Sequence, residues 1–193
     1  MLRIRSTRHR QGGLTMIEVL ITIVILAFGL LGLAGLQSKI HVALVESYQR
    51  AQAVLLLTDM TERIKANRNQ AASYVTADVL GTDDSQPDDC NTTAIGVARD
   101  HCEWSKALKG AAEVKDTANV GAMAGARGCI TEVQAPNPAS GVCTPGIYQV
   151  TVAWQGMYET KAPDAACGKD LYGADTQRRA ISARVSVGLP SCS

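Results

Sequence analysis

The chain has 193 residues, which leaves room for one modest domain beyond an N-terminal helix. Its formal net charge is only +1, and this value excludes the strongly basic surface that is typical of nucleic-acid-binding proteins. The charge is unevenly distributed, because four arginines lie within the first ten residues while the rest of the chain carries 15 Lys and Arg against 18 Asp and Glu.

An apolar run follows this basic leader directly. The run spans the 23 residues 14–36 and contains a single charged side chain, that of Glu18. A helix needs about 20 apolar residues to cross a bilayer, so the run is long enough to span a membrane. Positively charged flanks stay in the cytoplasm. The sequence therefore predicts one membrane-spanning helix with its N-terminus inside and most of the chain outside.

Glu18 is an unusual residue for such a helix. A carboxylate costs about 2–3 kcal/mol at the centre of a membrane helix and less near its ends. We therefore expect Glu18 to have a function. The alternative is that its side chain only reaches the lipid headgroups.

The residues around Glu18 form a recognisable motif. Gly13 is followed by Leu14-Thr15-Met16-Ile17-Glu18 and then by the apolar run. This motif resembles the processing site of type IV prepilins and pseudopilins. The resemblance implies that prepilin peptidase cuts after Gly13 and that Leu14 becomes the N-methylated N-terminus. It also implies that Glu18 guides docking into a growing fibre.

The resemblance also implies partners and a location. The partners would be the peptidase, other minor and major pilins, an inner-membrane assembly platform and membrane lipid, with no cofactor and no nucleic acid. The protein would first cross the inner membrane once, with a periplasmic head, and then enter a fibre at the cell surface, with its tip as one possible position. Major pilins usually carry a proline in the apolar half of the helix, where this chain has Gly29, Gly32 and Gly35.

The helix is expected to continue beyond the membrane. Residues 37–68 contain no proline or glycine and carry two apolar stripes at helical spacing. The first stripe consists of Ile40, Leu44, Tyr48, Ala51 and Leu55, and the second of Ala53, Leu57, Met60 and Ile64. Two interpretations remain open. Either the first stripe meets other subunits while the second packs into the head, or the head buries the helix broadly.

The last third of the chain predicts a sheet. Apolar and polar residues alternate over 148–154 and over 181–189, and 129–133 is a third candidate strand. A short helix is expected within 104–120. The predicted fold class is α+β, with a long helix packed on a small antiparallel sheet. The expected divisions are a leader (1–13), a transmembrane helix (14–36), its amphipathic continuation (37–68) and a disulfide-tied head (69–193).

All six cysteines lie after residue 89. An even number of cysteines outside the cytoplasm predicts three disulfides, and six cysteines permit 15 pairings. We expect sequential pairs, which are Cys90–Cys102, Cys129–Cys143 and Cys167–Cys192.

Catalysis and metal binding are not expected. His101 adjoins Cys102, but a Cys-His nucleophile needs a free thiolate and Cys102 is expected to be paired. Adjacent His and Cys are also poorly spaced for a closed zinc site. The acidic loop 81–90 lacks the glycine and the terminal glutamate of a calcium-binding EF-hand loop.

Three functions remain open. Residues 147–156, followed by Arg178-Arg179, are similar to the minor pilin family called PilV, which favours a minor pilin needed for assembly or priming of type IV pili and contributing to adhesion or motility. The first alternative is a pseudopilin of a type II secretion system. The second is a secreted soluble binding protein, released by an ordinary signal peptidase near Ala34.

Overall fold

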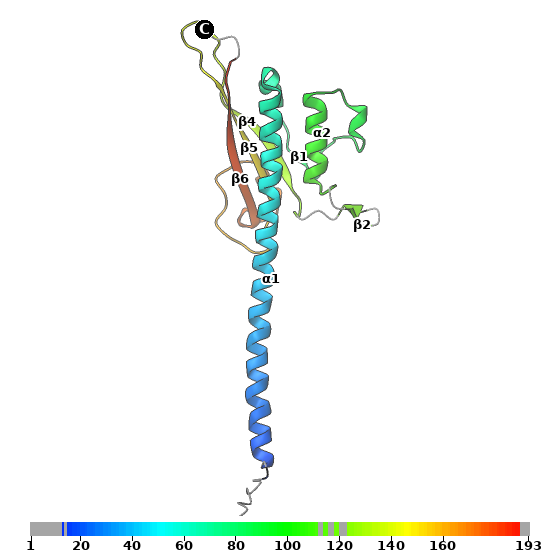
Figure 1. Ribbon diagram of the computed structural model, residues 1–193, viewed down its shortest axis with the longest axis vertical. Helices are drawn as coiled ribbons and strands as arrows, with labels where there is room; N and C mark the ends of the chain where they lie inside the picture. Colours follow the sequence, from blue (N-terminus) through cyan, green and yellow to red (C-terminus); the bar gives the residue numbers. More distant parts are fainter. Residues whose placement is uncertain (1–12, 14, 112–113, 116–117, 120–122, 190–193) are drawn as a thin grey trace, which may run out of the picture. The chain divides into compact units, whose positions relative to one another are not determined.

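A computed structural model describes residues 13, 15–111, 114–115, 118–119 and 123–189. The chain forms two compact units, divided between Ala43 and Leu44. Figure 1 shows the elements, which run in chain order as α1 (Met16–Ala66), η1 (Arg68–Tyr74), β1 (Leu80–Gly81), η2 (Cys90–Thr92), α2 (Val97–Leu108), β2 (Val114–Lys115), β3 (Ala118–Asn119), β4 (Arg127–Gln134), β5 (Gly146–Gln155), η3 (Asp175–Gln177) and β6 (Arg178–Val187).

The first unit is the N-terminal part of α1. It forms a continuous helix because its residues are mostly Leu, Ile, Val and Ala, and because Gly29, Gly32 and Gly35 do not interrupt the hydrogen-bonded turns. A Cβ atom added at any of these three glycines would have no described atom within 4 Å. The space around them is therefore open.

The second unit is the head, and its sheet has the strand order β1-β4-β5-β6. All neighbouring strands are antiparallel. The distal part of α1 belongs to this unit, so the predicted α+β fold is confirmed. Strands β4 and β5 include the predicted strands 129–133 and 148–154, and β6 contains 181–187 of the predicted 181–189. The period-2 alternation of apolar residues marks the face that packs on the helices.

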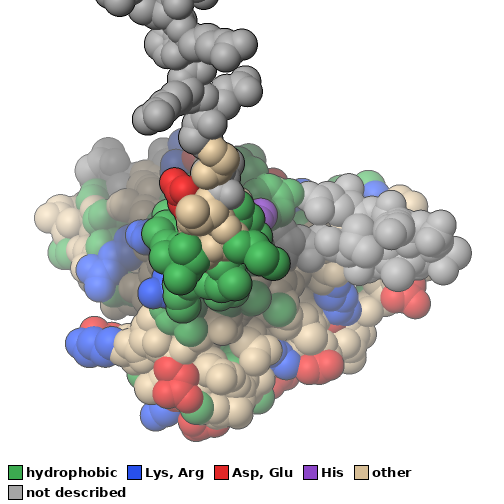
Figure 2. Space-filling view, turned by 90° about the horizontal axis from the view of Figure 1, so that it is seen from below, with side chains coloured by type: hydrophobic (Ala, Val, Ile, Leu, Met, Phe, Trp, Pro, Cys, Tyr) green, Lys and Arg blue, Asp and Glu red, His purple; other side chains and the backbone are tan. Residues whose placement is uncertain are grey.

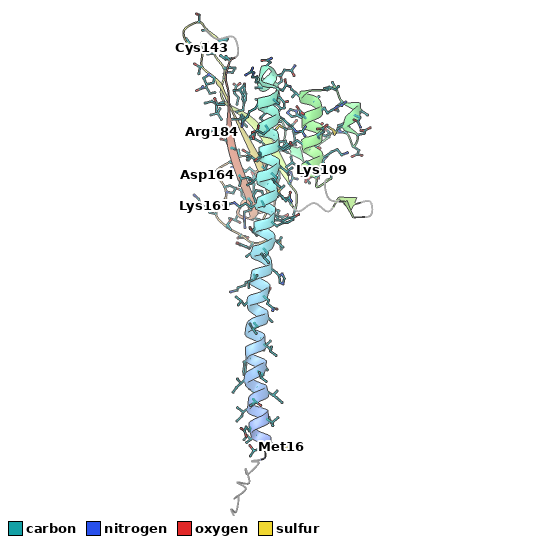
Figure 3. The ribbon with its side chains drawn as sticks, in the orientation of Figure 1. Met16, Lys109, Cys143, Lys161, Asp164 and Arg184 are labelled. Carbon is teal, nitrogen blue, oxygen red and sulfur yellow. A yellow bond between two sulfur atoms is a disulfide. The ribbon has the colours of Figure 1, made fainter. Side chains whose placement is uncertain are left out.

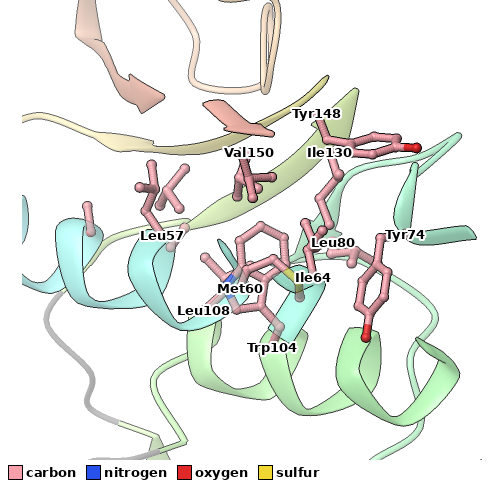
Figure 4. Close-up of a cluster of buried hydrophobic side chains, with 14 of the residues drawn as sticks. Leu57, Met60, Ile64, Tyr74, Leu80, Trp104, Leu108, Ile130, Tyr148 and Val150 are labelled. Atoms are coloured by element: carbon pink, nitrogen blue, oxygen red, sulfur yellow. The ribbon is translucent and has the colours of Figure 1, made fainter. Parts of the chain in front are cut away.

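The core lies between the helices and one face of the sheet (Figure 4). Helix α1 contributes the second predicted stripe, in which Ala53, Leu57, Met60 and Ile64 are all buried. Strands β4, β5 and β6 contribute side chains such as Ile130, Val150, Val152 and Val185. The head therefore includes half of α1 as one wall of its own core.

Helix α2 contributes Trp104 and Leu108 to the same core. The Trp104 indole is fully buried, and its Nε1 donates a hydrogen bond to Leu56 O on α1 at 2.9 Å. The ring also lies against Gly128 of β4, where an added Cβ would come within 2.3 Å of it. Only glycine therefore fits at this position. The helix predicted within 104–120 is wrong in its bounds, because Trp104 lies near the end of α2 and the two-residue strands β2 and β3 follow it.

Two disulfides are resolved in the head. One is the predicted Cys90–Cys102 bridge. The other joins Cys129 to Cys167, so the predicted pairs Cys129–Cys143 and Cys167–Cys192 are wrong. Cys143 is disulfide-bonded and lies in the hairpin between β4 and β5 (Figure 3), whereas Cys192 lies outside the described residues.

The physical reason for this correction is the path of the loop 156–177. The loop returns across the outer face of the sheet, where Cys167 and Tyr172 pack on Ala153 of β5 and against Cys129 of β4. Arg178 holds the loop in place. Its guanidinium is buried and donates to both Asp175 carboxylate oxygens and to the carbonyl oxygens of Ala165, Cys167 and Pro163. The prediction of sequential cysteine pairs fails here because this return of the loop brings Cys167 next to Cys129.

The two resolved disulfides should differ in their effect on stability. Replacing Cys129 and Cys167 by alanine should lower the free energy of unfolding by about 4 kcal/mol, and replacing Cys90 and Cys102 by about 3 kcal/mol, from the loop lengths alone. The difference follows from sequence separations of 38 and 12 residues. Denaturant unfolding of the two double variants measures it. A larger loss for the Cys90–Cys102 variant would contradict the assigned role of the loop.

Candidate functional site

The N-terminal end of α1 brings together the residues that the motif singled out. Gly13 is exposed and precedes the helix, whereas Leu14 lies outside the described residues. Helix α1 begins at Met16, which is labelled in Figure 3. The Glu18 backbone N–H donates to Thr15 O at 3.0 Å, and its distance to Thr15 Oγ1 is 3.4 Å. Thr15 therefore accepts a hydrogen bond from one of the backbone N–H groups that have no partner within the first turn of a helix.

Glu18 lies in the first turn of α1. A negative charge at this end of a helix interacts favourably with the helix dipole, typically by about 0.3–1 kcal/mol. Among the described residues, the Glu18 carboxylate has no ion-pair or hydrogen-bond partner. The neighbouring polar side chain behaves differently, because Thr22 Oγ1 donates to Val19 O at 2.8 Å within the helix. Glu18 is therefore the polar group here that still needs a partner.

The apolar side chains after Glu18 are all exposed. No residue of α1 from Met16 to Ile40 is buried, and Phe28 exposes 71% of its surface. Figure 2 shows hydrophobic side chains gathered around the near end of the helix. In the described part of the chain, α1 is the one helix long and apolar enough to cross a membrane. Each exposed Leu, Ile or Phe forgoes about 1.5–3 kcal/mol of burial, so this segment needs lipid or protein around it.

The first predicted stripe stays exposed where α1 enters the head. Leu44, Tyr48, Ala51 and Leu55 lie on the face of the helix opposite the buried stripe, and Leu55 exposes 62% of its surface. The apolar surface of α1 therefore continues past the membrane-length segment. Of the two interpretations of the stripes, the structure supports the one in which the head covers only the second stripe.

An ion pair that the sequence did not reveal fixes α1 to the sheet. Glu46 of α1 pairs with Arg179 of β6 at 3.2 Å, and their side chains are only 16% and 14% exposed. Glu46 Oε1 also accepts from Met157 N at 2.7 Å, and Arg179 Nη2 donates to Tyr158 O at 2.6 Å. The Arg179 guanidinium lies over the Tyr158 ring, with its Cζ 5.3 Å from the ring centroid. No sequence pattern links residues 46 and 179, because 133 positions separate them.

A second polar network joins α1 to α2. Arg63 pairs with Asp100 at 2.8 Å and with Glu103 at 2.7 Å. The Tyr74 hydroxyl donates to Asp100. Burial, followed by this hydrogen bond to a carboxylate, raises the pKa of Tyr74 to about 12. Both networks hold the distal half of α1 against the head.

His101 belongs to the same region and is partly buried. Its Nε2 lies 3.1 Å from Tyr74 O, and burial lowers the pKa of its imidazole. It lines a polar pocket of about 660 Å³ together with Asp78, Asp83 and Asp84. Asp83 and Asp84 are already paired, with Arg127 and Lys109 respectively. Within the described ranges, no three His, Cys, Asp or Glu side chains are arranged to hold a metal ion.

Comparisons with known families match the first half of the chain. A model of the prokaryotic N-terminal methylation motif matches residues 8–34. A second model, described as type IV pilin Tt1218 and named Tt1218-like, matches residues 35–104. No curated protein and no solved structure matches the chain. The two matched segments adjoin each other and together cover α1, the connection to α2 and most of α2.

The Glu46–Arg179 pair should matter more than the exposed ion pairs of the same helix. Replacing Glu46 by Gln leaves a mostly buried guanidinium without its counter-charge, which should cost about 3 kcal/mol of unfolding free energy. The matched control is Glu62→Gln, which removes the exposed pair with Lys65 and should cost about 0.5 kcal/mol or less. Urea unfolding measures both. Equal losses would show that Glu46 does not fix α1 to the sheet.

Proposed function

We propose that this chain, which belongs to the type IV pilins, is a minor pilin that helps to assemble or prime type IV pili. Type IV pilins are structural proteins and not enzymes, so its function is to join a fibre. One observation carries the proposal. The N-terminal part of α1 is an unburied apolar helix with a single carboxylate that has no partner among the described residues.

Processing would prepare this helix for assembly. We infer that prepilin peptidase cuts after Gly13 and that the new N-terminal amine of Leu14 is methylated. The match of the methylation motif to residues 8–34 supports this step, because it includes both residues. Gly13 is exposed and precedes Met16, the first helical residue. Removal of the leader also removes the four arginines that hold the N-terminus in the cytoplasm.

Docking would then satisfy the Glu18 carboxylate. An ionised carboxylate in a dry fibre core is costly unless a cation pairs with it. The Leu14 amine of a neighbouring subunit supplies that cation in our proposal. Because Glu18 is the one charged residue between Leu14 and Ser38, this pair would select a single axial register between subunits.

Two environments would cover the apolar surface in turn. Before assembly, bilayer lipid surrounds the helix, with the N-terminus in the cytoplasm and the head in the periplasm. After assembly, helices of other minor and major pilins replace the lipid, and the inner-membrane assembly platform transfers the subunit. The exposed stripe formed by Leu44, Tyr48, Ala51 and Leu55 would extend the contact with other subunits up to the head.

The minor role, and a part in adhesion or motility, rest on the similarity of residues 147–156 and Arg178-Arg179 to the PilV family. In the structure the first segment covers strand β5 and the beginning of the loop after it, and the two arginines begin β6. Deleting the gene should abolish or strongly reduce surface pili, and the protein should be a small fraction of the sheared pilus preparation. Normal piliation together with loss of type II secretion would show that the chain is a pseudopilin instead.

Changing Glu18 tests the docking step separately. Glu18→Gln keeps the size of the side chain and removes its charge, so cleavage should proceed while incorporation into fibres falls at least tenfold. Thr22→Val is the matched control, because the Thr22 hydroxyl is satisfied within its own helix and should be dispensable. Immunoblots of sheared pili and of membranes measure incorporation and cleavage. Unchanged incorporation of Glu18→Gln would rule out the docking role.

A further inference from the structure

The sheet of the head has one long open edge. β6 is its last strand and spans 10 residues, Arg178–Val187. Every second residue of an edge strand directs its N–H and C=O away from the neighbouring strand. In the described part of the chain, no backbone group outside β5 bonds to β6 beyond its first residues. The outer edge of β6 therefore presents a row of backbone donors and acceptors without backbone partners.

The opposite edge of the sheet is protected. β1 contains only two residues, Leu80 and Gly81. Next to it, Thr76 is bonded to β4 in both directions, because its N–H donates to Ile130 O at 3.0 Å and its hydroxyl accepts from Ile130 N at 3.1 Å. Proteins usually protect long edges with prolines, bulges or covering loops, because open edges pair with other chains. β6 contains no proline and pairs with β5 over all ten residues without a bulge.

Basic side chains flank this edge on both faces of the sheet. Arg184 projects from the outer face and is exposed, with Gln149 as its hydrogen-bond partner at 3.4 Å. On the helix side, Lys65 and the exposed Arg68 line a groove of about 200 Å³ with Ser186, Val187 and Gly188. Arg68 and Arg184 have no carboxylate partner among the described residues. Three other basic side chains do not contribute, because each is already paired with a carboxylate: Lys65 with Glu62, Arg178 with Asp175 and Arg179 with Glu46.

We propose that the free edge of β6 accepts an extended acidic segment of another protein chain as an additional antiparallel or parallel strand. Main-chain hydrogen bonds would supply the affinity, as in other cases of β-strand addition. Because side chains alternate between the two faces of a strand, carboxylates on one face would meet Arg184 and those on the other would meet Arg68. The proposal does not depend on the fibre role, since it concerns the head alone.

The charges of β6 argue against a second copy of the same strand as the occupant. β6 contains three arginines and no acidic residue. A second copy of β6 would therefore offer no carboxylate to Arg184. An acidic strand from a different segment supplies the opposite charge, and opposite charges on neighbouring strands stabilise a strand pair.

The test uses the full chain in detergent micelles and a blocked ten-residue peptide of alternating valine and glutamate as the probe. The peptide should bind and should slow amide hydrogen exchange in residues 181–187 by about tenfold or more. Two comparison peptides separate the contribution of charge from that of backbone hydrogen bonds. A peptide with lysine in place of glutamate should not bind, because the basic side chains beside β6 repel it. A glutamate peptide N-methylated at its four central residues should not bind either, because successive N–H groups of a strand point to opposite edges and N-methylation therefore removes donors at both edges.

Charge reversal in the chain provides the second arm. Arg68→Glu combined with Arg184→Glu should weaken binding about tenfold or more. Lys161→Glu is the control, because Lys161 is an exposed residue of the loop 156–177, away from Arg184 (Figure 3), and should leave binding unchanged. The proposal fails if the glutamate peptide does not bind at about 1 mM. It also fails if the N-methylated peptide binds equally well, if charge reversal has no effect, or if β6 is already protected in a dimer of the chain.

Discussion

The structure depends on one constraint, which is that a long apolar helix surface has no cover within its own chain. From Met16 to Ile40 no residue of α1 is buried, although the backbone is satisfied within the helix. Glu18 is the one charged residue between Leu14 and Ser38, and its carboxylate has no partner in the described residues. Exposing these apolar side chains to water is unfavourable, so other molecules must surround the helix. Lipid can cover the apolar side chains, but a partner for Glu18 requires a cation, and a neighbouring subunit can supply both.

The head is built so that this surface stays available. Buried residues on one face of α1 complete the head core, and the Glu46–Arg179 and Arg63–Asp100 pairs fix the same half of the helix to β6 and to α2. The opposite face keeps Leu44, Tyr48 and Leu55 exposed. One face of the helix therefore completes the head core, while the opposite face stays exposed. The disulfide between Cys129 and Cys167 strengthens the sheet face that the helices do not cover.

The sequence predicted those parts of the molecule that local patterns determine. The helix expected from Leu14 onward is α1, and the alternation of Tyr148, Val150 and Val152 located β5 correctly. The fold class followed from these elements. Long-range contacts were not predictable in the same way. No spacing indicates that the loop 156–177 returns over β5, so Cys129 was assigned to Cys143 instead of Cys167, and Glu46 gave no sign of its partner Arg179. The processing residues Gly13 and Leu14 remain predictions from the motif.

The most direct test of the account is the mass of the mature N-terminal peptide, measured from cells with and without prepilin peptidase. The account predicts a peptide that begins with methylated Leu14 when the peptidase is present and an uncleaved leader when it is absent. A mature protein that begins at Gly35 in both strains would contradict it. In that case Glu18 would be discarded with the leader, and the chain would be a secreted protein with no helix for docking into a fibre.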